Sequence, residues 1–288
     1  MPALIDLRKR IRSVKNTQQI TQAMKTVATA KLKKVQRTVI EARPYWHSYP
    51  NFLSEAAFWA ARYEHPLLMK REEKRIEGVI ITSDKGLCGA FNSNLLEKAL
   101  SFFEEKAKQS DIRLVLMGKK AVTFFKKHPF PLDRTYSGKV EKLTPEELKD
   151  LAQFLLQLYT FSKTDGVYVV YNEFKSILSP RITIAKILPI EIPENKEAQE
   201  RLTPDWEPEA GPIFNTLLPL YVENQISHSF FESSAAEHAA RMMAMDNATQ
   251  NAEDLISDLT LVLNKIRQAS ITKELLEIMT AVEALAKR

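Results

Sequence analysis

Residues 83–92, SDKGLCGAFN, form the segment of this sequence most suited to phosphate binding, because two glycines lie between an apolar run and an expected helix. A glycine-rich phosphate loop requires G-x-G-x-x-G or G-x-x-x-x-G-K-[ST], and the segment fits neither pattern. The run GKK at 118–120 also fails, because Lys120 stands where Ser or Thr is required. We therefore interpret Asp84, Gly86 and Gly89 as parts of a tight structural turn, and we predict no bound cofactor.

The other side chains that could do acid–base, nucleophilic or metal chemistry are scattered along the chain. Cys88 is the only cysteine, which excludes an internal disulfide, and no base adjoins it in sequence. Glu237 and His238 are neighbours in an expected helix, where we expect both to be solvated. The five histidines lack metal-ligand spacing: His47, His65, His128, His228 and His238. The sequence predicts no catalytic and no metal-binding residue.

Charge and glycine are distributed unevenly along the 288 residues. Residues 1–40 hold ten Lys or Arg and one acid, Asp6, whereas residues 41–288 hold 31 basic and 35 acidic side chains. All seven glycines lie from Gly78 to Gly211, so neither end contains glycine, which weakens a helix. No run of about 18 apolar residues occurs, and the N-terminus lacks the apolar core of a secretory signal. We expect a soluble chain with two long terminal helices.

The first of these helices is predicted from residue 3 to residue 43, where Pro44 and Pro50 allow it to bend or end. Its apolar residues have helical spacing in two sets with an offset between them: Leu4, Leu7, Ile11 and Val14, then Ile20, Met24, Val27, Ala28, Leu32, Val35 and Val39. Two interpretations of the offset remain open. Either the supercoil changes locally, or Gln18, Gln19 and Thr21 mark a contact with something other than a partner helix.

The second long helix is predicted after Pro219, because residues 220–288 contain neither Gly nor Pro. Its heptad stripe is Ala248, Ala252, Leu255, Leu259, Val262, Ile266 and Ala269, and a second apolar row is Ile256, Leu263, Ile271, Leu275, Ile278 and Val282. A helix with a single apolar stripe needs a partner, so we expect the two chain ends to pair in antiparallel fashion with both termini at the same end. The longer C-terminal helix is expected to remain single for part of its length.

The middle of the chain alternates strands and helices. Strands are predicted at 76–82, 112–117, 167–171 and 181–188, with an uncertain short strand near Tyr136, and helices at 94–108, 119–127 and 145–159. Thr144 and Glu147 fit a capping box. The fold class is therefore a mixed α+β and α/β protein, with a long antiparallel coiled coil of N- and C-terminal helices and a central three-layer, Rossmann-like α/β domain. The predicted domains are 1–58, 74–206 and 207–288.

Three motifs, in this order along the chain, closely resemble the γ subunit of the F-type ATP synthase: ITQAMKTVATAK at 20–31, SDKGLCGAFN at 83–92 and RQASITKELLEIMTA at 267–281. The resemblance covers the full length. It implies a central rotor shaft that couples proton-driven rotation of the c-ring to conformational change and ATP synthesis or hydrolysis at the β-subunit sites. The shaft is enclosed by the α and β subunits, its base joins the ε subunit and the c-ring, and the chain itself is not an enzyme.

The resemblance also assigns contacts with the β-subunit loops to particular positions: Met24, Lys25, Lys31, Lys33, Lys34, Arg267, Gln268, Thr272 and Glu274. The family and the lack of a transit peptide imply a peripheral location on the cytoplasmic face of a bacterial cell membrane, with membrane association only through the complex. At 278–281 this chain has IMTA where relatives often carry small residues, which leaves the close packing there open. It also lacks the cysteine-bearing insertion of the chloroplast form.

Two other functions remain as alternatives to the rotor shaft. A nucleic-acid-binding coiled coil would use the basic N-terminal segment, but the Lys and Arg of that segment point to several sides of the helix and have no aromatic residues between them. We therefore predict no nucleic-acid partner. A nucleotide-dependent enzyme would use the middle domain, where no phosphate-loop motif occurs.

Overall fold

The computed structural model describes residues 2–60, 65–176, 180–191 and 210–286. The chain divides into two compact units, one made of residues 1–28 with 242–288 and the other of residues 29–241. Two long helices contribute to both units: α1, Pro2–Ala60, and α5, Ala210–Ala286. Helix α1 continues through Pro44 and Pro50 instead of ending there. The predicted three-part division stays a prediction, and its boundary at residues 206 and 207 lies outside the described residues.

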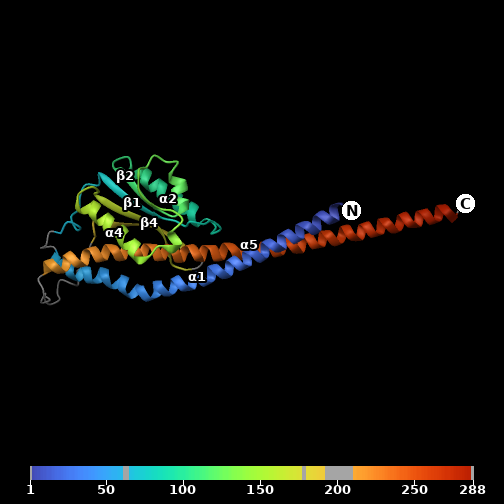
Figure 1. The fold of residues 1–288 in the computed structure, drawn as a ribbon, viewed down its shortest axis with the longest axis horizontal. Coiled ribbons are helices and arrows are strands. Elements are labelled where there is room, and N and C mark those ends of the chain that lie inside the picture. Colours follow the sequence, from blue (N-terminus) through green and yellow to red (C-terminus); the bar gives the residue numbers. More distant parts are fainter. Residues whose placement is uncertain (1, 61–64, 177–179, 192–209, 287–288) are drawn as a thin grey trace. The chain divides into compact units, whose positions relative to one another are not determined.

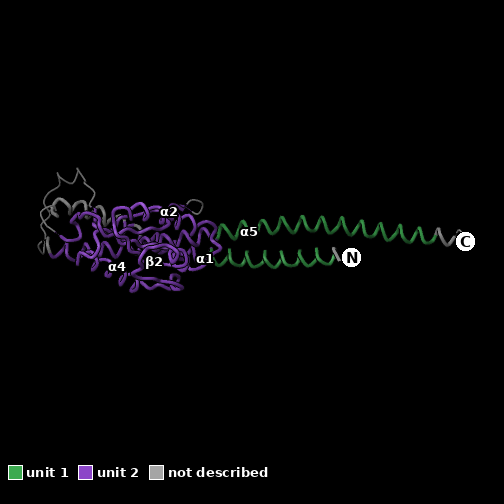
Figure 2. The backbone as a smooth tube through the Cα atoms, turned by 90° about the horizontal axis from the view of Figure 1, so that it is seen from above, with its two compact units in different colours: residues 1–28, 242–288 green, residues 29–241 purple. Residues whose placement is uncertain are grey.

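The first unit consists of the two helices running in opposite directions (Figure 2). Thr21 of α1 lies opposite Thr249 of α5, with 2.8 Å between their hydroxyl oxygens, and Lys25 donates to Asp246 at 2.6 Å. Partner numbers fall along α5 as they rise along α1, so the pairing is antiparallel, and the predicted pairing of the two chain ends is confirmed. By this register, α5 continues beyond the start of α1.

The stripe that α1 buries in this unit differs from the predicted one. Its buried or half-buried positions alternate in steps of three and four without a break: Leu4, Leu7, Ile11, Val14, Gln18, Thr21, Lys25 and Ala28. Ile20 and Val27 are instead 60% and 57% exposed. The predicted offset is therefore wrong, because a pattern restricted to apolar residues passes over the polar members of the stripe. Thr21 bonds to the partner helix, which also contradicts the idea that it marks an outside contact.

The stripe on α5 follows the predicted heptad only in part, because Ala248, Ala252, Leu259 and Ile266 are buried or half-buried but the other members are exposed. Observed buried or half-buried positions are Met245, Thr249, Ala252, Ile256, Leu259, Leu263 and Ile266. Leu255 and Val262 of the predicted stripe are 39% and 43% exposed. Apolar residues lie on both sides of the shared positions Ala252, Leu259 and Ile266, so the sequence offers two faces of similar hydrophobicity. The pairing of Thr249 with Thr21 selects one of them.

The second unit contains a five-stranded sheet in the order β3-β2-β1-β4-β5. The strands are β1 (Arg75–Ile81), β2 (Asp111–Met117), β3 (Leu132–Tyr136), β4 (Gly166–Phe174) and β5 (Pro180–Leu188). Neighbouring strands are parallel except β4 and β5, which pair in antiparallel fashion. The uncertain strand near Tyr136 is thus present as β3, at one edge of the sheet.

Helices cover both faces of this sheet, which confirms the three-layer α/β class. Helices α2 (Phe91–Lys106) and α3 (Lys119–Phe125) pack on one face, and α4 (Pro145–Thr160) with the first part of α5 packs on the other (Figure 1). The predicted capping box begins α4, because the Thr144 hydroxyl accepts from the Glu147 backbone and Glu147 accepts from the Thr144 backbone. In β1, a Cβ at Gly78 would lie 2.3 Å from the Phe103 ring, so only glycine lets α2 pack this closely.

A cluster of charged and aromatic side chains ties the amino-terminal edge of the sheet together. The Glu73 carboxylate, just before β1, accepts from Lys106 at 2.7 Å, from the Tyr168 hydroxyl at 2.7 Å and pairs with Lys186 at 2.8 Å. Burial alone would raise the pKa of Glu73, but the bonds from Lys106, Lys186 and Tyr168 outweigh it and lower the pKa to about 2. One carboxylate thus joins α2, β4 and β5 to the start of β1.

We predict that Glu73→Gln destabilises the second unit by about 2 kcal/mol at pH 7. The folded pKa of Glu73 lies below the ordinary value of 4.5, so its stabilisation is complete above pH 4.5 and is lost as the pH falls towards 2. The difference in urea midpoint between the wild-type chain and the variant should therefore shrink below pH 4.5. Glu72→Gln is the matched control, because Glu72 pairs with Lys74 at an exposed position. Equal midpoints at pH 7 for all three chains would contradict the prediction.

Candidate partner-contact surface and the loop after β1

The first shaft motif, residues 20–31 of α1, presents an apolar strip on the side away from α5. Ile20, Met24 and Val27 lie within about 60° of one another around the helix at 100° per residue. Ile20 and Val27 are exposed and Met24 is half-buried. We call these three residues the outer strip. The spacing of apolar residues predicts all three in the buried stripe, whereas the resemblance assigns Met24 to a partner contact; the outward position of Ile20 and Val27 was not predicted.

The charged members of this motif have partners within the chain. Lys25 donates to Asp246 of α5 at 2.6 Å, and Lys31 donates to Glu141 at 2.8 Å. Glu141 belongs to a single 3-10 turn, η1, Val140–Lys142. Lys33 and Lys34 are exposed. All three lysines are assigned to β-subunit contacts. Lys31 differs from Lys33 and Lys34 because it is paired with a residue of the α/β part of its own unit.

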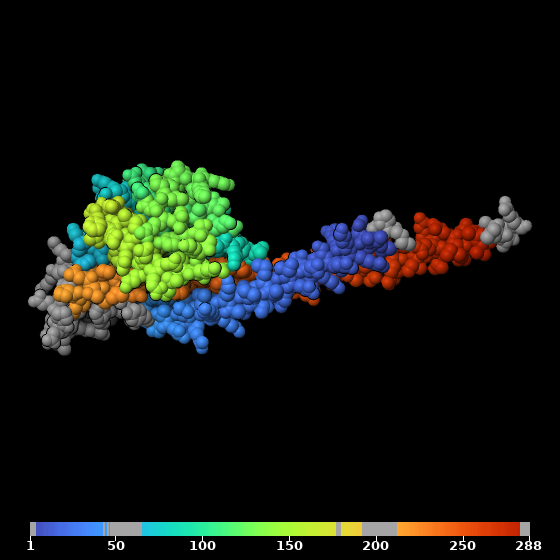
Figure 3. Space-filling model, in the orientation of Figure 1, coloured from blue at the N-terminus to red at the C-terminus, as the bar shows by residue number. Residues whose placement is uncertain are grey.

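The last shaft motif, residues 267–281 of α5, is exposed over almost its whole length. The assigned contact residues Arg267, Gln268, Thr272 and Glu274 are all exposed. From the register of Thr21 and Thr249, Pro2 at the start of α1 lies opposite about residue 268, so the rest of α5, about 27 Å at 1.5 Å per residue, passes beyond it. In Figure 3 no other described segment covers this part of α5 on the face shown.

Large apolar side chains lie along this single part of α5. At least half of each is exposed: Ile271, Leu275, Leu276, Ile278, Met279 and Val282. Residues 278–281, where the sequence departs from the small residues of the resembled family, are exposed as well. A helix that leaves so many apolar residues in water is typical of a segment that another protein encloses.

In the second unit, residues 83–92 form a turn held by its own side chains. The Asp84 carboxylate accepts three backbone N–H groups, from Lys119 at 2.9 Å, Gly138 at 2.7 Å and Val140 at 2.9 Å. Asp84 thereby joins the loop after β1 to the start of α3 and to the segment after β3. Gly89 has φ +57°, which a residue with a side chain adopts at a cost, whereas Gly86 lies near the end of Lys120.

Ser83, Cys88 and Asn92 close the inside of this turn. Asn92 accepts from the Ser83 backbone at 3.1 Å, and its amide nitrogen lies 2.8 Å from the Ser83 hydroxyl and 3.1 Å from Cys88 Sγ. Burial raises the pKa of the Cys88 thiol, which keeps it protonated and weakly nucleophilic. These polar groups are used to hold the loop.

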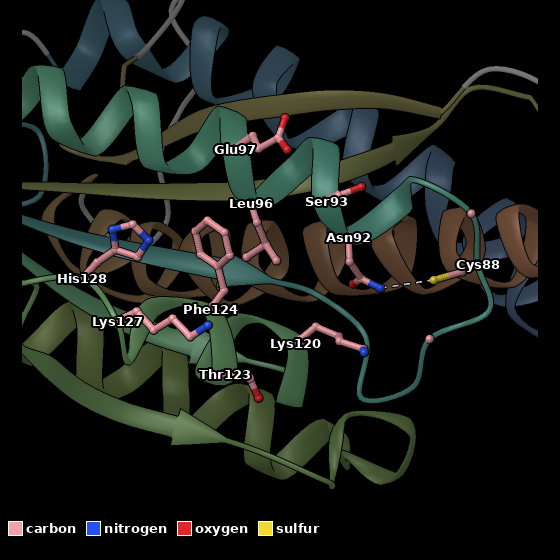
Figure 4. A pocket seen from close by; sticks show the side chains of 12 residues that line it. Cys88, Asn92, Ser93, Leu96, Glu97, Lys120, Thr123, Phe124, Lys127 and His128 are labelled. Carbon is pink, nitrogen blue, oxygen red and sulfur yellow. Dashed lines mark hydrogen bonds between the residues drawn. The ribbon is translucent and has the colours of Figure 1, made fainter.

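A groove of about 500 Å³ lies outside this loop, between α2 and α3 (Figure 4). Lys120, Lys127 and His128 line it on the α3 side, and Glu97 lines it on the α2 side. This is the edge at which α/β sheets commonly bind ligands. The described residues include no group of three or more His, Cys, Asp or Glu side chains placed to hold a metal ion.

On α5, near the same loop, the expectation that Glu237 and His238 are solvated is wrong. They are 4% and 5% exposed, and Arg241, one turn further on, is 7% exposed. Arg241 pairs with Glu237 at 2.7 Å. Burial, aided by the charge of Arg241, lowers the pKa of His238 to about 4, so its ring is neutral at pH 7. The adjacent acid and base gave no sequence signal of burial, because their burial depends on the segments that pack around this part of α5.

Comparison with known proteins identifies the family. The family model described as ATP synthase matches residues 3–285, and the ATP synthase gamma chain of Pelotomaculum thermopropionicum is 42% identical over 285 residues, covering 99% of this chain and all of the relative. This chain belongs to the ATP synthase gamma chain family. The gamma chain of Solibacter usitatus is 44% identical over 288 residues, covering 99% of both chains.

Solved structures agree on the fold. A chain in the central stalk and c-ring structure of the Tetrahymena thermophila mitochondrial ATP synthase has a TM-score of 0.59 and 26% identity, covering 80% of this chain and 99% of its own. A chain in the Euglena gracilis OSCP/F1/c-ring structure has a TM-score of 0.65 and 21% identity, covering 99% and 95%, and supports the fold alone. As a member of this family, the chain serves as the central rotor shaft of an F-type ATP synthase. None of the described helices meets the length and hydropathy needed to span a membrane.

We predict that Asp84→Ala lowers the free energy of unfolding by about 2 kcal/mol, because three backbone N–H groups lose their acceptor. Asp84→Asn should recover only part of this loss, since an amide cannot accept at both ends. Urea unfolding followed by circular dichroism measures both effects. Glu97→Ala, an exposed position on the rim of the groove, is the control. If Asp84→Ala and Glu97→Ala unfold at the same urea concentration, the bonds of Asp84 contribute little.

Proposed function

We propose that this chain turns inside a ring of α and β subunits and is joined through its α/β domain to an ε subunit and a c-ring. Proton-driven rotation of the c-ring turns the shaft, and the shaft moves the β-subunit sites through successive conformations. The chain performs no chemical step itself. The observation that carries this proposal is the exposed apolar surface of α5 beyond residue 268, which no other part of the described chain covers.

The contacts with β-subunit loops are proposed at two levels of the shaft. Met24 and Lys25, together with Ile20 and Val27 of the outer strip, form the contact on α1. Arg267, Gln268, Thr272 and Glu274 form the contact on α5 where the helix pair ends and the single part begins, and all four side chains are exposed to a surrounding subunit. Lys33 and Lys34 are exposed cations suited to acidic loops. Individually weak contacts suit a shaft that must turn without being trapped.

The shape of the helix pair fits a shaft that acts differently on three surrounding sites. Neither helix contains Gly in the first unit, which favours stiffness. A paired part followed by a single part makes the surface asymmetric along its length, so each catalytic subunit meets a different face at a given moment. We place the complex on the cytoplasmic face of a bacterial cell membrane, with this chain held there by its partners.

The proposal is tested by purifying the affinity-tagged chain from membranes of cells that express it with the other subunits of its complex. We expect α, β and ε subunits to accompany it, and we expect ATP hydrolysis by the purified complex in vesicles to acidify the lumen. The chain alone should neither hydrolyse ATP nor bind it in isothermal titration. Recovery of the chain without α and β subunits, or saturable ATP binding by the chain alone, would contradict the proposal.

We predict that Val27→Asp weakens assembly while the isolated chain remains equally stable. Val27 is 57% exposed and away from α5, so the added charge costs less than about 0.5 kcal/mol of folding free energy. In a complex it would place a carboxylate against the β-subunit contact. Melting followed by circular dichroism and the yield of α and β subunits in the tagged purification are the measurements.

Thr26→Asp is the matched control for Val27→Asp, because Thr26 is exposed on the adjacent position but outside the outer strip. We expect it to assemble as the wild-type chain does. Equal yields for Val27→Asp and the wild type would show that the outer strip has no partner. A lower melting temperature for Val27→Asp alone would show instead that Val27 acts within the chain.

A further inference from the structure

Arg241 is a buried cation that joins α5 to the loop after β1. Its guanidinium pairs with Glu237 at 2.7 Å, and the same Nη2 lies 3.5 Å from the Lys85 carbonyl oxygen and 3.4 Å from the Gly86 carbonyl oxygen. Its Nη1 lies 3.4 Å from Nδ1 of the neutral His238 ring. An arginine side chain is always charged and donates in fixed directions, so these acceptors define one rotation of α5 relative to the loop.

A second connection joins α1 to the same loop through Glu141. One carboxylate oxygen, Oε2, accepts from Lys31 of α1 at 2.8 Å and from Lys85 of the loop at 3.4 Å. Together these charges lower the pKa of Glu141, which keeps it ionised at pH 7. The Lys85 side chain therefore shares Glu141 with Lys31 of α1, and the Lys85 carbonyl oxygen lies near the guanidinium of Arg241 of α5. We call Lys31, Lys85, Glu141, Glu237 and Arg241 the clasp.

The clasp lies at the limit of the second unit, where α1 enters it and α5 leaves it. That unit begins at Thr29 and ends at Arg241, so Lys31 and Arg241 are within two residues of its limits. The buried apolar contacts of α5 with the sheet side run from Phe214 to Phe230, so the last of them lies about three turns before Arg241 along the helix. At this end of the unit, α5 is held to the loop by polar groups.

Directional bonds do something here that apolar packing does not. Hydrophobic contact is non-directional and permits a helix to rotate about its axis at small cost, whereas a bond to a fixed carbonyl or carboxylate is lost when the helix rotates. A buried ion pair is also a poor source of stability, because removing its charges from water costs about as much as their attraction returns. We therefore expect these bonds to resist rotation of α5 about its axis more than they add to the free energy of unfolding.

We propose that Arg241 and Glu141 are positioning residues that transmit torque between the α/β domain and the two shaft helices. This inference rests on the proposed rotor function. Under load, the domain and the shaft helices are twisted against each other, and the clasp holds both helices to one loop, so that they turn with the domain. Without the clasp, the shaft helices rotate less than the α/β domain under load. ATP hydrolysis and proton transport are then less tightly coupled when the complex works against a proton gradient.

The test uses the complete complex in vesicles and measures the largest proton gradient that ATP hydrolysis sustains, normalised to the amount of assembled complex. We expect Arg241→Gln to lower this gradient about threefold while the initial hydrolysis rate changes by less than about twofold, because only the loaded state twists the clasp. Glu141→Gln should lower it by a smaller factor, since its bonds are partly exposed.

Two further variants separate torque transmission from folding. Arg241→Lys keeps the charge and volume but cannot reach Glu237 and both carbonyls at once, so it should assemble fully and still sustain a reduced gradient. Asp150→Asn is the matched control, because it breaks the exposed pair of Asp150 with Arg134 inside the α/β domain and leaves both shaft helices untouched. It should sustain the wild-type gradient.

The outcomes distinguish the clasp from the rotor function itself. A wild-type chain that supports no ATP-driven gradient contradicts the proposed function. A wild-type gradient in complexes containing Arg241→Lys and Glu141→Gln overturns the clasp and leaves the rotor function standing. If Arg241→Gln fails to assemble, these two variants decide the question. A reduced gradient in Asp150→Asn equal to that of Glu141→Gln would also overturn it, because the loss would then reflect any broken ion pair of the domain.

Discussion

The need of an amphipathic helix for a partner governs both ends of this chain. Neither α1 nor α5 can bury its stripe alone, and within the first unit each buries it against the other in steps of three and four residues. This pairing fixes the antiparallel direction. It also fixes which faces remain outside, because surface buried in the stripe is not available to another subunit, whereas Lys25 at its edge keeps a third of its side chain exposed. The pairing leaves two apolar surfaces uncovered: the outer strip on α1 and the exposed apolar residues of α5 from Ile271 to Val282.

Polar residues select among the pairings that apolar residues allow. The hydroxyls of Thr21 and Thr249 meet within the stripe, and Lys25 and Asp246 meet at its edge. In an apolar stripe such pairs cost stability but disfavour any register that would leave them unpaired. In the second unit, Asp84 has a comparable effect on the loop after β1, where it aligns three backbone N–H groups from two other segments.

Sequence reasoning succeeded where the pattern has a single solution. The strands β1, β2 and β4 are nearly continuous apolar runs, and the capping box at Thr144 has a defined geometry, so both were predictable. The stripe on α5 was not, since Leu255 and Ile256 compete for the same place and only the partner helix decides. The burial of Glu237, His238 and Arg241 depends on which loop lies against α5, which is long-range information that local spacing lacks.

The candidate contact residues show the same division. Arg267, Gln268, Thr272 and Glu274 were assigned by resemblance, and their exposure within this chain leaves them available. Lys31 and Lys33 look equivalent in the sequence, yet Lys31 is half-buried and bonded to Glu141, whereas Lys33 is exposed. Their difference arises from the position of η1, which no motif near the lysines records.

The bare end of α5 has a consequence for how the protein must be made. Six large apolar side chains are exposed to water along about three turns of helix until other subunits cover them. Such a surface attracts chaperones and other unfinished chains, and it favours aggregation when the chain accumulates alone. A cell that makes this subunit in step with its partners avoids that aggregation. The exposed end of α5 therefore requires balanced synthesis of the subunits.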